Sequence, residues 1–229
     1  IYCTGPLTAT LTPTNRYCIV TKSPLTGLFS DSYAGGYFSQ ELKYAGYDIL
    51  VISGKARKPV YIWIDDGDVE VKPADHLWGL DTYQTYDVLK KDLGDKTVKI
   101  SCIGPAGENL VKFALVDSDY HRQAGRCGTG AVMGSKNLKA IAIRGTGEIS
   151  VADLKAFDET VWKCYEQIRE SIASQEYTRG GTQSFTAFAN EERFFPTRNF
   201  QDGFFEKYEN LGEESQRKHL WLREYGCFA

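Results

Sequence analysis

The chain has 229 residues, of which 42% are hydrophobic, 25% charged and 13% aromatic, a composition typical of a globular fold with a sizeable core. The formal net charge is −3 and the isoelectric point about 5.7, so these totals exclude no small ligand but give no reason to expect a nucleic acid or an anionic membrane as a partner. No apolar run approaches the roughly 20 residues that cross a bilayer, and no signal peptide opens the chain.

The six cysteines are scattered, with no close pair and no CxxC motif inside the chain: Cys3, Cys18, Cys102, Cys127, Cys164 and Cys227. In a chain of this length that spacing predicts reduced thiols and a cytoplasmic protein, not a disulfide framework. Five of them are expected to be small core residues. The chain starts with Ile1 and stops shortly after Cys227 without a polar tail, so both ends look like internal cuts.

The first half of the chain predicts strands with short helices. The Asp66-Gly67 pair between two alternating apolar runs predicts a hairpin, because Asp-Gly supplies the positive φ that a tight turn needs. Gly94 ends an amphipathic run and marks a helix terminus. The expected elements are strands at residues 17–22, 48–53, 59–64, 69–72 and 98–103, and a helix at residues 81–93.

The next segments continue the mixture of strands and short helices, and the chain then becomes helical. Residues 113–116 and 140–144 are predicted as strands, and residues 131–137 as a short helix. From Ser150 onward, helical periodicity takes over, with one long helix expected at residues 151–174 and a last helix at residues 213–223. We therefore predict a domain boundary near residues 147–151, which separates a first domain (1–149) from a second segment (150–229).

Three segments concentrate glycine, arginine and small polar residues: residues 12–17, 31–38 and 121–130, all predicted as loops. Glycine lets a backbone approach a bulky ligand closely, and arginine offers a planar fork for phosphate. Together they indicate a cradle for a phosphorylated cofactor, although each one alone is equally well a turn with a solvated arginine. The chain has no GxxxxGK[ST] and no GxGxxG after a strand, so nucleotide binding fits poorly.

Several longer strings carry a more specific signal, since they recur in the same order in one known family. They are Gly5-Pro6-Leu7-Thr8, Arg16-Tyr17, the TKSPLTG string at 21–27, the AGGYF string at 34–38, and the strings at 41–48, 103–111 and 121–141. Over about residues 1–147, and more loosely beyond, the chain resembles the aldehyde:ferredoxin oxidoreductases. The resemblance implies an α+β fold: a pterin-cradling domain of two antiparallel sheets with short helices, followed by the start of a helical domain.

The resemblance also implies cofactors. Such enzymes hold tungsten (or molybdenum) through the dithiolene sulfurs of two pyranopterins, with a [4Fe–4S] cluster nearby and magnesium bridging the pterin phosphates. Arg16 matches the arginine between pterin and cluster, and Tyr33 and Gln123 match positions whose main-chain carbonyls hold the magnesium. The remaining matched positions line the cradle: Ala34, Gly35, Gly36, Arg122, Ala124 and Gly125.

Three positions depart from the family pattern. Many relatives have Asn at the position of Tyr33, Ala at that of Gln123, and Gly at that of Cys127. Contacts through the main chain would survive the first two changes, and Cys127 is expected to be a small buried residue. Cys227 resembles the first cysteine of the family's CxxCxxxC string and is interpreted as a cluster ligand, although one thiolate cannot hold a cluster.

The implied activity is oxidation of an aldehyde and water to a carboxylic acid, with electrons passing through the cluster to ferredoxin. No catalytic residue is named, because in the family the acid/base groups lie beyond this segment. Three alternatives stay open: a paralogous bis-pterin enzyme such as a benzoyl-CoA-reductase-type subunit, an inactive cofactor-binding scaffold, and a nucleotide-binding module. The aldehyde and the metal are not fixed by the sequence, and a homo-oligomer is one of the assemblies it leaves open.

Overall fold

The computed structural model describes residues 1–220, which fall into two compact units. One unit covers Ile1–Val151 and the other begins at Ala152. Over the described residues, every helix is too short or too polar to cross a bilayer. The assignment of a pterin-binding role to the first segment and of a truncated helical region to the second stays a prediction.

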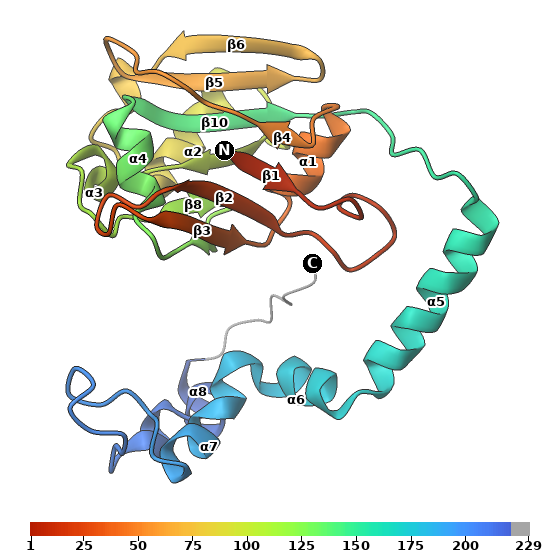
Figure 1. The fold of residues 1–229 in the computed structure, drawn as a ribbon, viewed down its shortest axis with the longest axis vertical. Coiled ribbons are helices and arrows are strands. Elements are labelled where there is room, and N and C mark those ends of the chain that lie inside the picture. Colours follow the sequence, from red (N-terminus) through yellow and green to blue (C-terminus); the bar gives the residue numbers. More distant parts are fainter. Residues whose placement is uncertain (221–229) are drawn as a thin grey trace. The chain divides into compact units, whose positions relative to one another are not determined.

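The first unit contains a four-stranded antiparallel sheet in the order β3-β2-β1-β4 (Figure 1). Its strands are β1 (Tyr2–Thr4), β2 (Tyr17–Lys22), β3 (Phe29–Ala34) and β4 (Ile49–Leu50). Side chains alternate in burial along β3, with Ser30, Ser32 and Ala34 facing the core. The other face of β3 is exposed, as the two-residue period of a strand requires for a sheet covered on one side.

A second sheet has six strands in the order β6-β5-β10-β7-β8-β9. They are β5 (Val60–Asp65), β6 (Asp68–Pro73), β7 (Lys99–Cys102), β8 (Val116–Ser118), β9 (Arg122–Ala124) and β10 (Leu138–Arg144). The β5–β10 pair is parallel and the other pairs are antiparallel, so this sheet is mixed, and the expectation of two wholly antiparallel sheets is wrong for it. The α+β class itself is confirmed.

The main core lies between the two sheets. Tyr2, Tyr17 and Phe38 pack their rings together on the side of the first sheet, with ring centroids 5.2–5.8 Å apart. Buried residues of β5 and β10, among them Ile64 and Ile141, cover them from the other side. A smaller core lies between the second sheet and helix α2 (Thr82–Asp92).

Short helices pack around the sheets. Besides α2 they are α1 (Phe38–Tyr44), α3 (Pro105–Glu108), α4 (Thr129–Ser135) and the 3-10 turn Asp75–Leu77. Asp81 and Gln84 form a capping box at the start of α2, and Gly94 follows its end with φ +68°. A Cβ on Gly134 would lie 2.0 Å from the carbonyl oxygen of Gly107, so only glycine allows α3 and α4 to approach this closely.

The second unit consists of helices and turns. Its elements are α5 (Leu154–Glu170), α6 (Ile172–Gly180), α7 (Thr186–Glu191), α8 (Glu213–His219) and the 3-10 turns Gly181–Phe185 and Tyr208–Leu211 (Figure 1). The single helix predicted at 151–174 is wrong, because Ser171 is extended (ψ 126°) and separates α5 from α6. The predicted last helix is observed as α8, and residues 221–223 of that prediction lie outside the described residues.

Several predicted elements of the first unit are confirmed, including the strand at 17–22, the hairpin around Gly67 and the helix α2. The strand predicted at 48–53 is only two residues long, and that predicted at 113–116 starts at Val116. All three predicted loops contain strand residues: Tyr17 begins β2, residues 31–34 end β3, and residues 122–124 form β9. These segments were predicted as loops because of their glycine and small polar residues, a composition that does not favour strands.

Candidate functional site

The three predicted ligand-binding segments meet where the edges of the two sheets come together. The edge strand β3 of the first sheet lies against the edge strand β9 of the second. Tyr17 pairs with Ala34 across β2 and β3, so Arg16, just before β2, and Gly35, just after β3, follow at the same end of this antiparallel pair. We call residues 15–16, 33–36 and 122–125 the cradle segments.

The first two cradle segments are also connected through helix α1. The Ser39 hydroxyl donates a hydrogen bond to the main-chain oxygen of Asn15 at 2.7 Å, and both residues are buried. This bond fixes the chain just before Arg16 against the chain just after Gly36. The guanidinium of Arg16 is exposed, and within residues 1–220 it has no hydrogen-bond or ion-pair partner.

Gly36 brings the third cradle segment into contact with the second. It is buried with φ +96°, a backbone conformation that favours glycine. A Cβ at this position would lie 2.5 Å from Oδ2 of Asp119 and 2.9 Å from Cγ of Arg122. The Gly35-Gly36 turn and Arg122 are therefore neighbours, and a side chain at residue 36 would force them apart.

Asp119 holds this arrangement together. Its Oδ2 accepts hydrogen bonds from the main-chain N–H groups of Tyr37 (2.5 Å) and Phe38 (3.1 Å). Burial raises the pKa of Asp119, while the two N–H groups and the ammonium groups of Lys99 and Lys90 oppose that shift. The sequence reasoning missed Asp119; the available signal was an aspartate in a short turn between two strands, where Asp tolerates left-handed backbone.

The turn that carries Asp119 is itself anchored by Tyr120. The Tyr120 ring lies 4.3 Å (centroid to centroid) from that of Tyr86, and its hydroxyl donates to Asp87 at 2.9 Å. The Lys90 ammonium lies 4.8 Å from the centre of the Tyr120 ring, within cation–π range. These contacts fix a turn in which Asp119 and Tyr120 both have positive φ (51° and 63°).

The Gln123 side chain is hydrogen-bonded to the neighbouring strand β8. Its amide donates to Oδ2 of Asp117 at 3.5 Å, and the Thr82 and Tyr86 hydroxyls donate to the same carboxylate. Burial raises the pKa of Asp117, and these hydrogen bonds partly offset the shift. The Gln123 side chain thus links β9 to Asp117 of β8, which the hydroxyls of Thr82 and Tyr86 also contact.

Tyr33 precedes the buried Ala34 in β3. It lies on the exposed face of the first sheet at 55% exposure, opposite Cys18. Hydrogen bonding with Asp31, followed by that with Cys18, raises the Tyr33 pKa to about 12. The two alanines Ala34 and Ala124 are buried, whereas Gly125 is exposed and a Cβ there would meet no atom within 4 Å.

Cys127 takes a left-handed conformation with φ 76°, and its thiol donates to the main-chain oxygen of Asp31 at 3.5 Å. It is half-buried beside β3, so the expectation of a small buried residue is met only in part; among the described cysteines Cys102 alone is fully buried, and Cys164 is exposed. Within residues 1–220, no group of three or more His, Cys, Asp or Glu side chains could hold a metal ion. Cys227, interpreted as a cluster ligand, lies outside the described residues.

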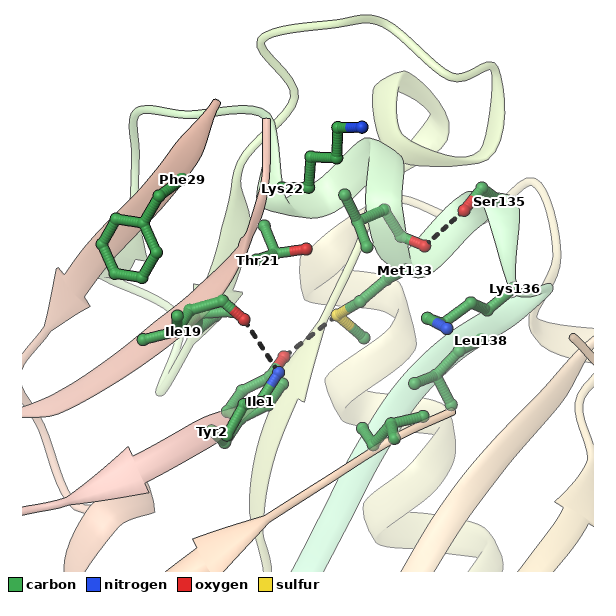
Figure 2. Close-up of a pocket in the computed structure, with 13 residues that line it drawn as sticks. Ile1, Tyr2, Ile19, Thr21, Lys22, Phe29, Met133, Ser135, Lys136 and Leu138 are labelled. Carbon is green, nitrogen blue, oxygen red and sulfur yellow. Dashed lines mark hydrogen bonds between the residues drawn. The ribbon is translucent and has the colours of Figure 1, made fainter. Parts of the chain in front are cut away.

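A separate cavity of about 600 Å³ lies between the first sheet and helix α4 (Figure 2). Figure 2 shows Tyr2 directed toward Met133, and the Tyr2 hydroxyl donates to the sulfur at 3.0 Å. Lys22 and Lys136 also line this cavity, and the Lys136 ammonium donates to the Gly54 carbonyl at 3.0 Å. None of the cradle segments lines it, so the cavity and the cradle are different features.

Two family models match the chain. The N-terminal domain of aldehyde ferredoxin oxidoreductase matches residues 1–145, and domains 2 and 3 of the same family match residues 159–229. The chain belongs to the aldehyde ferredoxin oxidoreductase family. All three cradle segments lie within the part matched by the family's N-terminal domain, which confirms the resemblance seen in the sequence.

Curated relatives and a solved structure agree with this membership. The tungsten-containing aldehyde ferredoxin oxidoreductases of Pyrococcus horikoshii and Thermococcus kodakarensis are 48% and 47% identical over 100% and 98% of this chain. An aliphatic sulfonate oxidoreductase, WOR-like subunit, of Pyrococcus furiosus is 31% identical over 98%. This family chain spans 38% of the length of each of these relatives.

A solved structure of the active site complex BamBC of benzoyl coenzyme A reductase, in complex with 1,5-dienoyl-CoA, shares the fold. The match has a TM-score of 0.72 and 37% sequence identity, and it covers 73% of this chain and 26% of that chain. The fold of this family segment is therefore found in enzymes with different named reactions.

Proposed function

We propose that this chain forms the cofactor-cradling part of a tungsten-dependent, bis-pterin aldehyde:ferredoxin oxidoreductase. The complete enzyme would oxidise an aldehyde and water to a carboxylic acid and pass the electrons through a [4Fe–4S] cluster to ferredoxin. The observation that carries the proposal is the convergence of Arg16, the Gly35-Gly36 turn and Arg122 at one junction between the sheets. Relatives named for this activity, 47–48% identical along the chain, support it.

The donors at this junction fit a ligand with anionic phosphate groups. Arg16 presents an exposed guanidinium without a partner in the described part of the chain, and Arg122 adds a second guanidinium. The planar fork of arginine matches phosphate oxygens, and a charge-assisted bond is roughly twice as strong as a neutral one. Open space beside Gly125 lets a ligand approach the main chain. The residues present therefore fit the pterin cofactor.

Each cradle residue has a role in this proposal. Arg16 and Arg122 bind phosphate or pterin oxygens, and the main chains of Ala34, Gly35, Gly36, Ala124 and Gly125 shape the surface. The main-chain carbonyls of Tyr33 and Gln123 would hold a magnesium ion, and Cys227 would contribute a thiolate to the cluster. When bound, the tungsten (or molybdenum) pterin would supply the redox chemistry, so this chain's residues bind and orient it.

A metal analysis tests the proposal most directly. The protein expressed from its complete gene and purified without oxygen should contain stoichiometric tungsten or molybdenum together with iron, and it should reduce a viologen dye with aldehydes. Arg16→Ala should lower the tungsten content. Arg57→Ala is the matched control, because Arg57 is also exposed and also without a partner within residues 1–220. Metal-free wild-type protein, or equal tungsten in both variants, would contradict the proposal.

One alternative has a specific observation in its favour. The structural match to a benzoyl coenzyme A reductase complex shows that the same fold occurs beside a CoA thioester. The cradle segments alone do not separate the two reactions, since both would use the same kind of cofactor. Aldehyde-dependent dye reduction without turnover of benzoyl-CoA supports the first function, and the reverse result supports the second.

Ferredoxin and a cytoplasmic location also belong to the proposal. Binding of reduced and oxidised ferredoxin by the complete protein, measured by calorimetry at low and physiological ionic strength, tests the electron partner. Absence of any ferredoxin-dependent turnover in an otherwise tungsten-loaded enzyme would remove ferredoxin from the proposal and leave the cofactor assignment standing.

A further inference from the structure

Asp119 connects two cradle segments that are far apart in the sequence. It stands at the turn between β8 and β9, three residues before Arg122, and its carboxylate accepts the N–H groups that follow the Gly35-Gly36 turn. The bonded residues are 82 and 81 positions away along the chain. A single side chain thus sets where the second and third cradle segments lie relative to each other.

We propose that Asp119 is a positioning residue of the cofactor site. Its carboxylate fixes the Gly35-Gly36 turn against the strand that carries Arg122, and it thereby sets the spacing of the groups that bind the phosphates. The role toward the cofactor rests on the proposed function above, whereas the carboxylate clamp between Asp119 and residues 37–38 does not. In this role Asp119 does not itself contact the ligand.

The hydrogen-bond donors of the clamp are the main-chain N–H groups of Tyr37 and Phe38, which have no carbonyl partner within helix α1. Tyr37 and Phe38 are the N-cap and first residue of α1, and the first N–H groups of a helix have no partner inside it. An ionised carboxylate satisfies them with charge-assisted bonds. Lys99 holds the same segment from a second side, since its ammonium lies 5.1 Å from the centre of the Tyr37 ring.

The backbone at Asp119 has a left-handed conformation that a non-glycine residue does not favour. Asp119 and Tyr120 are consecutive non-glycine residues with positive φ, a conformation that costs free energy and persists only where surrounding contacts offset that cost. Here the Tyr120 contacts with Tyr86 and Asp87 offset it. Strain of this kind is concentrated at sites where geometry matters for binding.

Asp66 offers a matched control elsewhere in the same unit. It also has positive φ (48°), and its carboxylate accepts the Thr146 N–H at 2.6 Å and the Thr146 hydroxyl at 2.9 Å, again 80 residues away. The two aspartates therefore share left-handed backbone, a carboxylate that accepts two hydrogen bonds, and a span of at least 80 residues, although one of the two donors to Asp66 is a hydroxyl and Asp119 is the more buried. Only Asp119 joins cradle segments, so a purely structural clamp predicts equal effects at both positions.

The test compares Asp119→Asn, Asp119→Ala and Asp66→Ala in the protein expressed from its complete gene. Two quantities are measured: tungsten per chain after dialysis, and deuterium exchange of the Tyr37 and Phe38 amides in cofactor-free protein. Asn keeps the left-handed preference and a neutral acceptor, so it should give an intermediate result. Asp119→Ala should speed exchange at both amides and weaken cofactor retention roughly tenfold, as loss of a positioning partner does at metal sites.

The outcomes separate the inference from the proposed function. Loss of tungsten graded from wild type through Asn to Ala supports the positioning role, provided that Asp66→Ala retains tungsten although its melting temperature falls about as far as that of Asp119→Ala. Full tungsten in Asp119→Ala, or equal loss in Asp66→Ala, overturns it while the proposed function stands. Wild-type protein without tungsten overturns the proposed function instead, and the exchange of the two amides still shows whether the clamp exists.

Discussion

Replacing Gly36 by alanine should damage the junction of the two sheets far more than the same change at Gly46. Both glycines have left-handed backbone, with φ +96° and +91°. A Cβ on Gly36 would lie 2.5 Å from the Asp119 carboxylate, whereas a Cβ on Gly46 would meet nothing within 4 Å. The pair therefore shares the backbone strain and differs in the steric clash.

The magnitude follows from the contacts. Left-handed backbone costs an alanine roughly 1–2 kcal/mol, and this is the whole effect expected at Gly46. At Gly36 the added methyl also displaces the Asp119 carboxylate from two N–H groups, and each hydrogen bond to a charged group contributes about 1.5–3 kcal/mol. Gly36→Ala should therefore destabilise the first unit by about 3 kcal/mol more than Gly46→Ala.

Urea unfolding followed by tryptophan fluorescence measures this difference, since Trp63 and Trp78 both belong to the first unit. A deuterium-exchange measurement on the peptide that contains Tyr37 would locate the loss. Equal free energies of unfolding for the two alanine variants would refute the reasoning, because the Asp119 carboxylate would then have moved aside without cost.

Three further predictions concern residues away from the cradle. Lys139→Met should destabilise the protein by about 3–5 kcal/mol, since the fully buried ammonium pairs with Glu108, and Glu108→Leu in the same chain should recover part of that loss in a thermal melt. Asp66→Asn should lower stability at neutral pH. Hydrogen bonds from Thr146 lower the Asp66 pKa, so its contribution is present above the ordinary value of 3.8 and is lost as the pH falls through the lowered pKa; acid melts of both proteins should converge. Cys102 should resist alkylation by a maleimide until urea unfolds the chain, because burial raises its thiol pKa to about 12; mass-spectrometric labelling of the native protein would contradict this.

Much of the first unit could be predicted from local patterns. The Asp66-Gly67 turn and the helix-ending Gly94 are local signals, so the sequence pattern alone predicted both the β5–β6 hairpin and helix α2. The ordered strings around the cradle segments also identified the family before any geometry was known. Local sequence pattern was enough to predict an element wherever a turn residue or the spacing of apolar residues determined it.

Long-range pairing explains what could not be predicted. Strand β9 is three residues long and forms because Val116 pairs with Ala124. The alternation of apolar and polar residues in so short a segment does not predict this pairing. Asp119 acquires its role only when the chain near Tyr37 arrives from 82 residues away. Likewise the parallel β5–β10 pair follows from tertiary arrangement, since a buried apolar strand accepts a neighbour in either direction.

Strand β10 reaches the middle of the second sheet although it is the last of its strands to be synthesised. Until residue 144 has left the ribosome, the β5–β6 hairpin and the β7–β8–β9 meander each keep an unpaired edge. Edges of this kind invite pairing with other chains during translation. Folding of this domain during translation therefore competes with self-association until β10 has been synthesised. Slower elongation upstream of Leu138 would lengthen the time for which these edges stay unpaired.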